Sequence, residues 1–574
     1  MSRPAALLLA ALLPTAGLVL AARTRAQEGR PVDAAPAAPR AVLEGHFATS
    51  LVCAQCHSEG QDATAMRDAQ GRSVAPFDLW RGSMMANSAR DPLWRAVVVA
   101  EAMATPSRAA EIQAECMRCH APMASFEAER LGEPPVNLDL LAKDDARAQL
   151  ALDGVSCTVC HQIPPEALGN DSGHLAIGGE RKLYGPHDAP FTTPMQRHTG
   201  YTPTASAHVR DARLCATCHT LHTTTLAPDG SETGHRLAEQ TPYLEWRNSV
   251  FDTERADPGP LAATCQGCHM PTTDDDGVAI ETRLARNPLG RDFPRLRPRA
   301  PFARHAFHGG NTLVPAMLRD HGPALGALAP REAFEATIAA TRAQLEGRTG
   351  RVSVLEAARE GGRVRARVKV ENLVGHKLPS GFPEVRRAWL RLRVLDAAGR
   401  ALVASGEHDD HGRIVGPDGA PLPSERAGGP VEPHRDLVAD PAQVALYEAV
   451  LADADGRPTW RLLRGASYLK DDRLLPRGWD PAHPDAAITA PVGLEGDADF
   501  VGGEDVVRFD LPLDHAGPVV VEAALLYQAL GARFAAELFV FDAPEVARLR
   551  ELFEGLPAAD RVPVVVARAR LELP

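Results

Sequence analysis

The strongest constraint on how this chain can fold is the pattern Cys-x-x-Cys-His, which occurs five times and uses all ten cysteines. This pattern is the attachment signature of c-type haem. Two thiols bind the vinyl groups of one porphyrin, and the adjacent imidazole binds its iron. The sequence therefore predicts five covalent haems, attached through Cys53 and Cys56, Cys116 and Cys119, Cys157 and Cys160, Cys215 and Cys218, and Cys265 and Cys268.

The histidine that ends each motif is the predicted proximal iron ligand. These ligands are His57, His120, His161, His219 and His269. Zinc is one alternative, but a Cys₄ site needs an even number of cysteine pairs, and zinc does not require a histidine after each pair. Thioredoxin-type disulfide chemistry needs one reactive pair near a βαβ pattern, not five pairs. Haem is the interpretation that accounts for every motif.

The first 26 residues have the pattern of a secretory signal peptide. Arg3 precedes an apolar run from Ala5 to Ala22, and a cleavage site is plausible near Ala22 or Ala26. An uncleaved membrane anchor is the alternative, because the run approaches the length of a spanning helix. Covalent haem attachment occurs outside the cytoplasm, where thiols would otherwise oxidise. We therefore expect a periplasmic or exported protein without a spanning segment after cleavage.

The chain of 574 residues is too long for one average domain. Between the motifs the sequence is rich in Pro and Gly, which leaves room for short helices and loops around a core of haems. Later segments such as RVRARVKVENLV and PVVVEAALLYQAL alternate in polarity, as β-strands do. The predicted fold is multidomain: a signal peptide (1–26), a flexible leader (27–45), a mainly α and irregular pentahaem cytochrome c domain (46–310), a helical connector (311–350) and a β-sandwich-like domain with a late helix (351–574).

The sixth coordination position of each iron is either occupied by a second, distal ligand or left open. The candidate distal ligands are Met84, His187, His198, His208, His305, His308 and His376, with His46, Met85 and Met123 as further candidates. Paired glycines after His308 would allow a close approach of backbone to porphyrin. For His376, in a turn rich in Gly and Pro, a plain loop is the alternative. A methionine ligand would raise the potential, but Met84 lies between tryptophans, where packing is common.

The residues around the haem motifs resemble those of a known protein family. GVSCTVCH, LCATCHTLH, CQGCHMP, EQTPYLEWRNS and HAFHGGN resemble periplasmic multihaem cytochromes c related to the tetrahaem electron acceptor of hydroxylamine oxidoreductase, over roughly residues 46–311. GHKLPSGFPEVRRAWL is similar to a β-rich module found behind such haem domains. The resemblance implies closely packed haems, mostly with two axial ligands. Two departures are a fifth motif and Met84, which follows Trp80 and Ser83 where the family often has a histidine.

Two functions follow from these features. The first is a respiratory electron carrier between redox proteins, either other cytochromes or a quinol-linked membrane complex. The alternative is an oxidoreductase that reduces a small nitrogen or sulfur oxyanion at one five-coordinate haem. The absence of a Cys-x-x-Cys-Lys motif favours the carrier, for which no residue is catalytic. A third hypothesis makes the C-terminal domain a partner-binding module. The formal charge of −12, before the haem propionates, argues against nucleic acid.

Three charged segments have less specific patterns. Seven arginines between residues 283 and 304 could pair with haem propionates or dock an acidic partner, or form a solvated loop. The segments TDDDG, at residues 273–277, and EHDDHG, at residues 407–412, contain possible metal ligands. Neither matches the spacing of an EF-hand. Surface turns are the favoured interpretation of both.

Overall fold

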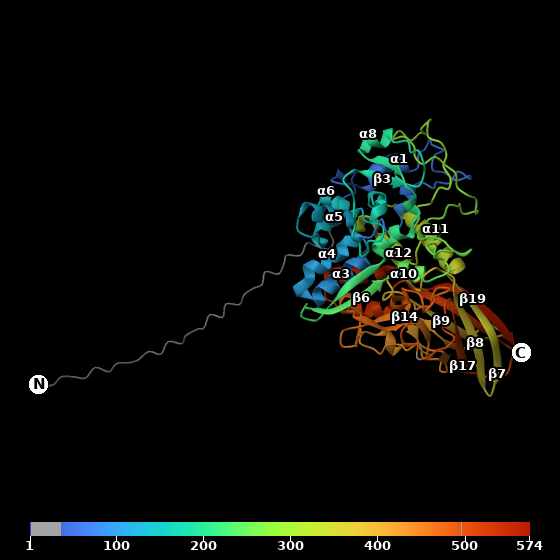
Figure 1. The fold of residues 1–574 in the computed structure, drawn as a ribbon. Helices are drawn as coiled ribbons and strands as arrows, with labels where there is room; N and C mark the ends of the chain where they lie inside the picture. The colour runs from blue at the N-terminus through green and yellow to red at the C-terminus, as the bar shows by residue number, and fades with distance from the viewer. Residues whose placement is uncertain (2–35, 495) are drawn as a thin grey trace.

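The structure is a computed structural model, which describes residue 1, residues 36–494 and residues 496–574 (Figure 1). Apart from Met1, the predicted signal peptide and the leader up to residue 35 lie outside the described residues. Among the described helices, none is both long enough and apolar enough to cross a membrane. The helices and loops that carry the five motifs occupy one half of the molecule, and the large sheets of the C-terminal residues occupy the other.

Each motif lies in a short helix that ends at its histidine or one residue before it. Polar side chains cap some of these helices: Asp211 accepts a hydrogen bond from Arg213 N, and Thr264 accepts one from Gly267 N. At each short helix, the two cysteines and the histidine lie within about one turn of one another. The motif helices are α1 (Ser50–His57), α4 (Ala109–His120), α7 (Cys157–Cys160), α9 (Ala212–His219) and α11 (Cys265–His269).

The motif region also contains strands, which the sequence did not indicate. An antiparallel hairpin joins β5 (Leu221–Leu226) to β6 (Glu232–Gln240), and β3 (Lys182–Gly185) pairs in parallel with β4 (Thr202–Ala205). Short helices and a two-stranded ribbon complete it: β1 (Leu43–Glu44), β2 (Phe47–Ala48), α2 (Pro76–Trp80), α3 (Pro92–Ala104), α5 (Pro122–Leu131), α6 (Ala146–Leu152), α8 (Thr193–Thr199) and α10 (Pro242–Arg247).

Two sheets pack face to face in the C-terminal half. The larger has the order β15-β14-β9-β18-β19, with β10 beside β9 and β16 beside β14; the smaller has the order β13-β17-β8-β7. Val368, Leu390, Phe509 and Leu525 belong to one buried cluster between them, so the region is a β-sandwich. The main strands are β7 (Gly350–Glu360), β8 (Arg363–Asn372), β9 (Arg387–Asp396), β14 (Ala445–Ala452), β17 (Glu504–Pro512), β18 (Val519–Gln528) and β19 (Val564–Leu573); the shorter are β10 (Ala401–Ser405), β13 (Leu437–Val438), β15 (Pro458–Thr459) and β16 (Ser467–Asp471).

A second apolar cluster joins the two halves. Helices α12 (Leu313–Leu325) and α13 (Arg331–Gln344) follow the last motif. Their buried side chains, including Met317 and Phe334, pack with α3 of the motif region and with α16 (Pro544–Gly555) of the C-terminal half. The halves therefore share a hydrophobic core, which fixes how the sandwich sits against the motif region.

The centre of the sandwich generates a stability prediction. Leu390 is fully buried in β9 and lies opposite Leu525 of β18 and Ala445 of β14. Leu390→Ala is expected to lower the free energy of unfolding by about 2–5 kcal/mol, because it leaves a cavity that both sheets line. Urea denaturation followed by far-ultraviolet circular dichroism measures the change. The control is Leu402→Ala on the exposed face of β10, expected within about 0.5 kcal/mol of the wild type; equal effects would contradict the assigned core.

Candidate haem sites

Backbone carbonyls orient four of the five motif histidines. Because a carbonyl oxygen only accepts hydrogen bonds, Nδ1 of each imidazole carries the proton and Nε2 keeps its lone pair free for a metal. This is the tautomer and the supporting contact that metal-ligating histidines use. The bonds run from His57 to Leu284 O (3.0 Å), from His120 to Ser88 O (3.1 Å), from His161 to Tyr184 O (2.6 Å) and from His269 to His308 O (2.7 Å).

Burial favours the neutral form of three of these imidazoles. Desolvation lowers the pKa of His57 and His161, and it lowers the pKa of His120 to about 4. His219 is solvent-accessible, yet desolvation by the surrounding protein and the nearby His269 lower its pKa to about 4. A neutral imidazole suits an iron ligand.

The cysteines show how the five motifs are arranged relative to one another. Thiols from different motifs lie close enough to raise the pKa of Cys53, Cys215 and Cys218, in three pairs: Cys53 with Cys157, Cys119 with Cys218, and Cys215 with Cys265. Cys160 of the third motif also interacts electrostatically with both cysteines of the fourth. The first motif is thus next to the third, the third next to the fourth, and the fourth next to both the second and the fifth. All five attachment sites form one connected group.

His305 lies opposite a motif histidine. The rings of His161 and His305 have centroids 6.2 Å apart and planes 22° apart. Two imidazoles that bind one metal ion from opposite sides, through nitrogens at roughly 2 Å, have centroids roughly 6 Å apart. His305 donates from Nδ1 to Ala303 O (3.1 Å), which leaves its Nε2 free. Burial lowers the pKa of His305 to about 4. The ring spacing would suit two ligands of one haem iron, and ligation by His305 stays a prediction.

His376 belongs to the sandwich but lies beside the fourth and fifth motifs, where it interacts electrostatically with His219 and His269. Its Nδ1 donates to Lys377 O (2.9 Å), so its Nε2 is also free. Burial lowers the pKa of His376. The C-terminal half therefore offers an imidazole to the motif region.

A buried ionic network anchors the loop that carries His376. Glu245 of α10 accepts hydrogen bonds from Lys377 N (3.0 Å), Ser380 Oγ (2.8 Å) and Arg473 (2.9 Å). Asp471 at the end of β16 bonds both Lys377 Nζ (2.7 Å) and Arg473 (2.8 Å). Burial alone would raise the pKa of Asp471, but the two cations outweigh it and lower the pKa to about 2. Two anions and two cations thus balance in the interior.

The other candidate distal ligands have different surroundings. His208 uses both ring nitrogens, with Ser206 Oγ (2.6 Å) and Ile163 O (2.8 Å). His308 supplies the carbonyl that orients His269, and burial lowers the pKa of its ring to about 4. His198 contacts Gln55 from an exposed position, and burial lowers the pKa of His187. Met84 packs against the apolar cluster shared by the two halves. Their coordination roles stay predictions.

The first motif depends on a segment that sequence reasoning treated only as basic. Arg286 N donates to Cys56 O (2.9 Å), and the Arg286 guanidinium bonds Gln55 O (2.8 Å) and Ser58 Oγ (2.6 Å) at the end of α1. Two positions upstream, Leu284 provides the carbonyl for His57. The segment therefore holds the C-terminal end of α1 in place. In the sequence, only its run of arginines indicated that this segment has a specific role.

Buried cations near the second motif suit the anionic propionates of a haem. Arg90 is 3% exposed, and its Nε has no hydrogen-bond partner among the described residues. Burial lowers the pKa of Arg90 to about 10. It lies two positions after Ser88, the residue that orients His120, and Trp94 stacks on the His120 ring at 4.4 Å. Arginine binds planar carboxylates through paired hydrogen bonds, so the donor set fits the implied group.

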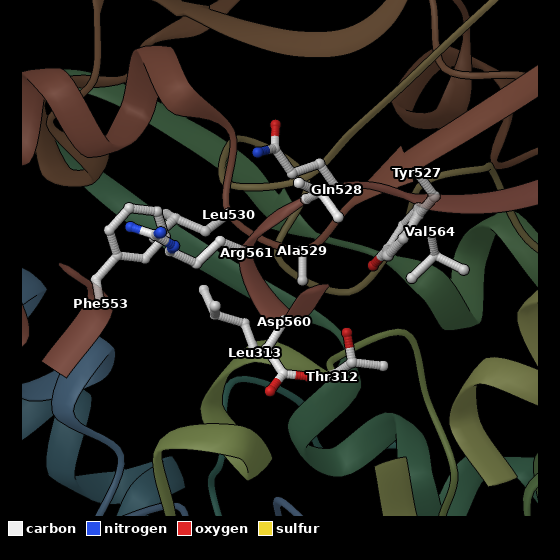
Figure 2. Close-up of a pocket in the computed structure, with 11 residues that line it drawn as sticks. Thr312, Leu313, Tyr527, Gln528, Ala529, Leu530, Phe553, Asp560, Arg561 and Val564 are labelled. Atoms are coloured by element: carbon white, nitrogen blue, oxygen red, sulfur yellow. The ribbon is translucent and has the colours of Figure 1, made fainter. Parts of the chain in front are cut away.

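Glycine in the segment HAFHGGN has a packing role. A Cβ at Gly310 would collide with Tyr527 Oη of β18, so a larger residue there would displace the tyrosine side chain. Tyr527 also lines the small pocket of Figure 2, between the start of α12 and the end of β18. The cavity volume of about 10 Å³ holds about one water molecule. This pocket is too small for a substrate.

Comparisons with known proteins add one likeness. Neither a family model nor a curated protein sequence matches the chain. Among solved structures, it is similar to a penta-heme cytochrome c552 from Thermochromatium tepidum, with 17% sequence identity and a TM-score of 0.46, over 92% of this chain and 99% of that chain. At this level of similarity the likeness does not assign a function, so a function has to be argued from the residues of this chain.

The pairing of His305 with His161 generates a spectroscopic prediction. His305→Ala is expected to convert one low-spin haem to high spin, and His305→Met to raise the reduction potential of that haem, because a thioether stabilises the reduced iron. Electron paramagnetic resonance and a spectroelectrochemical titration measure both effects. The matched control is His235→Ala, at an exposed position of β6. Unchanged spectra in both His305 variants would remove this residue from the iron sites.

The ionic network generates a stability prediction. Glu245→Gln is expected to cost about 3–5 kcal/mol of unfolding free energy, because the positive charge on Arg473 loses one of two buried partners. It should also shift the potential of the haem that faces His376. Thermal unfolding and redox titration measure the two effects. Glu360→Gln, which removes an exposed pair with Arg365, is expected to change stability by no more than about 1 kcal/mol; a comparable loss there would show that burial is not the cause.

Proposed function

We propose that this chain is an exported pentahaem c-type cytochrome that transfers electrons between redox partners. The contiguity of the five attachment motifs is the observation that carries the proposal. Haems attached at neighbouring thiols supply one-electron chemistry at short separations. An isolated haem enzyme would not need five such sites in one connected group.

The protein's own residues then position and tune the chain of sites. Backbone carbonyls hold the motif imidazoles in one tautomer and increase their basicity as ligands. His305 and His376 provide second imidazoles, which favour closed coordination and low potentials relative to methionine. Buried arginines such as Arg90 offset the charge of propionates. Axial ligation, burial and hydrogen bonding can together set potentials over a range of about 0.8 V.

The surface of the fifth motif suggests where partners dock. Cys268 is exposed, whereas the other nine cysteines are half-buried. We therefore assign electron exchange with redox proteins, such as other cytochromes or a quinol-linked membrane complex, to the fifth site. The exported location rests on the signal pattern of residues 1–26 and on the chemistry of haem attachment. The motif contexts favour kinship with the tetrahaem acceptor of hydroxylamine oxidoreductase, with the sandwich as an added module.

Coordination state separates this proposal from the oxyanion reductase. Electron paramagnetic resonance of the oxidised holoprotein, with haem quantitation, is expected to show five low-spin haems, because the chain carries further histidines, among them His305 and His376, that can serve as second ligands. A stoichiometric high-spin signal that nitrite or hydroxylamine perturbs would instead establish an enzyme with an open iron. His376→Ala is the accompanying variant: it should alter one haem component if the sandwich supplies a ligand, and an unchanged titration would make that residue structural.

A further inference from the structure

A cluster of ligand-bearing side chains lies within the β-sandwich, outside the candidate haem sites. One nitrogen of His434 and one carboxylate oxygen each of Asp497 and Asp505 all lie within 4.8 Å of one another. The three residues come from separate segments: His434 precedes β13, Asp497 lies between β16 and β17, and Asp505 is the second residue of β17. The fold thus brings three possible metal-ligand atoms close together.

One carboxylate oxygen of Asp505 in this cluster lacks a hydrogen-bond partner within the described part of the chain. The residue is 0% exposed, and its Oδ2 accepts a hydrogen bond from Tyr447 Oη (2.6 Å). Its Oδ1 is also buried and has no hydrogen-bond partner among the described residues. A buried carboxylate oxygen without a donor is costly. A cation held between Asp505, Asp497 and His434 would supply the missing partner.

His434 is held as metal-ligating histidines are. Its Nδ1 contacts Asp472 Oδ2 (3.0 Å), and its Nε2 contacts Asp497 Oδ2 (3.0 Å). Asp472 is 0% exposed and has Lys470 Nζ at 3.3 Å as a counter-ion, so it can accept the Nδ1 proton as a carboxylate. A carboxylate behind one ring nitrogen, with the other nitrogen facing the donors, is the usual support of a metal-binding imidazole.

We propose that His434, Asp497 and Asp505 bind one divalent first-row metal ion, with zinc as the best match. One imidazole nitrogen and two carboxylate oxygens suit zinc, with water as a fourth ligand. Binding replaces the Nε2 proton of His434, which is released to solvent. The ion ties β17 to the segments before β13 and after β16, and so closes one end of the sandwich.

A neighbouring all-oxygen group is the competing site. One oxygen each of Asp436, Asp497 and Asp499 also lie within 4.8 Å of one another, a donor set for calcium. Asp499 is exposed, however, and Asp436 is already paired with Arg508. The buried triad with His434 therefore has the stronger requirement for an ion.

The test uses the full-length, haem-loaded protein, stripped with a chelator and dialysed against Zn²⁺. Elemental analysis is expected to find one added zinc per chain, and the zinc-edge X-ray absorption spectrum to show one imidazole among oxygen donors. Asp505→Asn keeps an acceptor for Tyr447 but removes a charged ligand, so its zinc affinity should fall at least about tenfold; His434→Gln should do the same. The matched control is Asp436→Asn, which should bind zinc as the wild type does.

Three results would overturn the proposal. They are wild-type protein that takes up no zinc, a zinc-edge spectrum without an imidazole, and zinc affinity that is insensitive to both ligand variants. Loss of binding in Asp436→Asn, together with displacement of zinc by Ca²⁺, would assign the cation to the all-oxygen group instead. Haem absorbance and circular dichroism report the folding of each variant. If a variant misfolds, the wild-type zinc-edge spectrum still decides.

Discussion

The hydrogen bond from a motif imidazole to a distant backbone carbonyl is the interaction on which the motif region depends. His57 bonds Leu284, 227 positions away in the chain, so the segment after the fifth motif completes the first. Short helices of this size are marginal by themselves. What holds them is the set of contacts that each motif makes with a remote segment. The same bonds select the tautomer that can bind iron, so one interaction serves both folding and ligation.

The sandwich contributes to these sites through charges that are expensive to bury. Lys377, Asp471, Arg473 and Glu245 are each at most 3% exposed, and burying four ions costs several kcal/mol apiece before pairing. Their mutual contacts leave little freedom for the loop between β8 and β9. His376 is the side chain that this rigidity presents to the fourth and fifth motifs. A flexible loop would leave the distance between an imidazole and an iron undefined.

Local sequence patterns predicted the individual helices and strands, but they did not predict which of these pack against one another. The segment PEVARLRELFEG, with apolar residues at helical spacing, is α16, and RVRARVKVENLV contains β8. Motif spacing alone named every cysteine and every motif histidine. By contrast, the hairpin of β5 and β6 has a Thr-rich first strand without clear alternation, and nothing local indicated it. The pairing of His161 with His305, 144 positions apart, depends on tertiary packing, which periodicity does not encode.

The spatial order of the motifs also differs from their order along the chain. The fourth motif is next to the second, the third and the fifth, whereas the thiol contact of the first motif is with the third. The fourth attachment site is thus the one with the most neighbouring motifs among these thiol contacts. His219, which belongs to that site, is also the motif histidine for which no described carbonyl serves as a partner, and it faces His269 and His376. The sandwich therefore meets the motif region, through His376, at the attachment site that has the most neighbouring motifs.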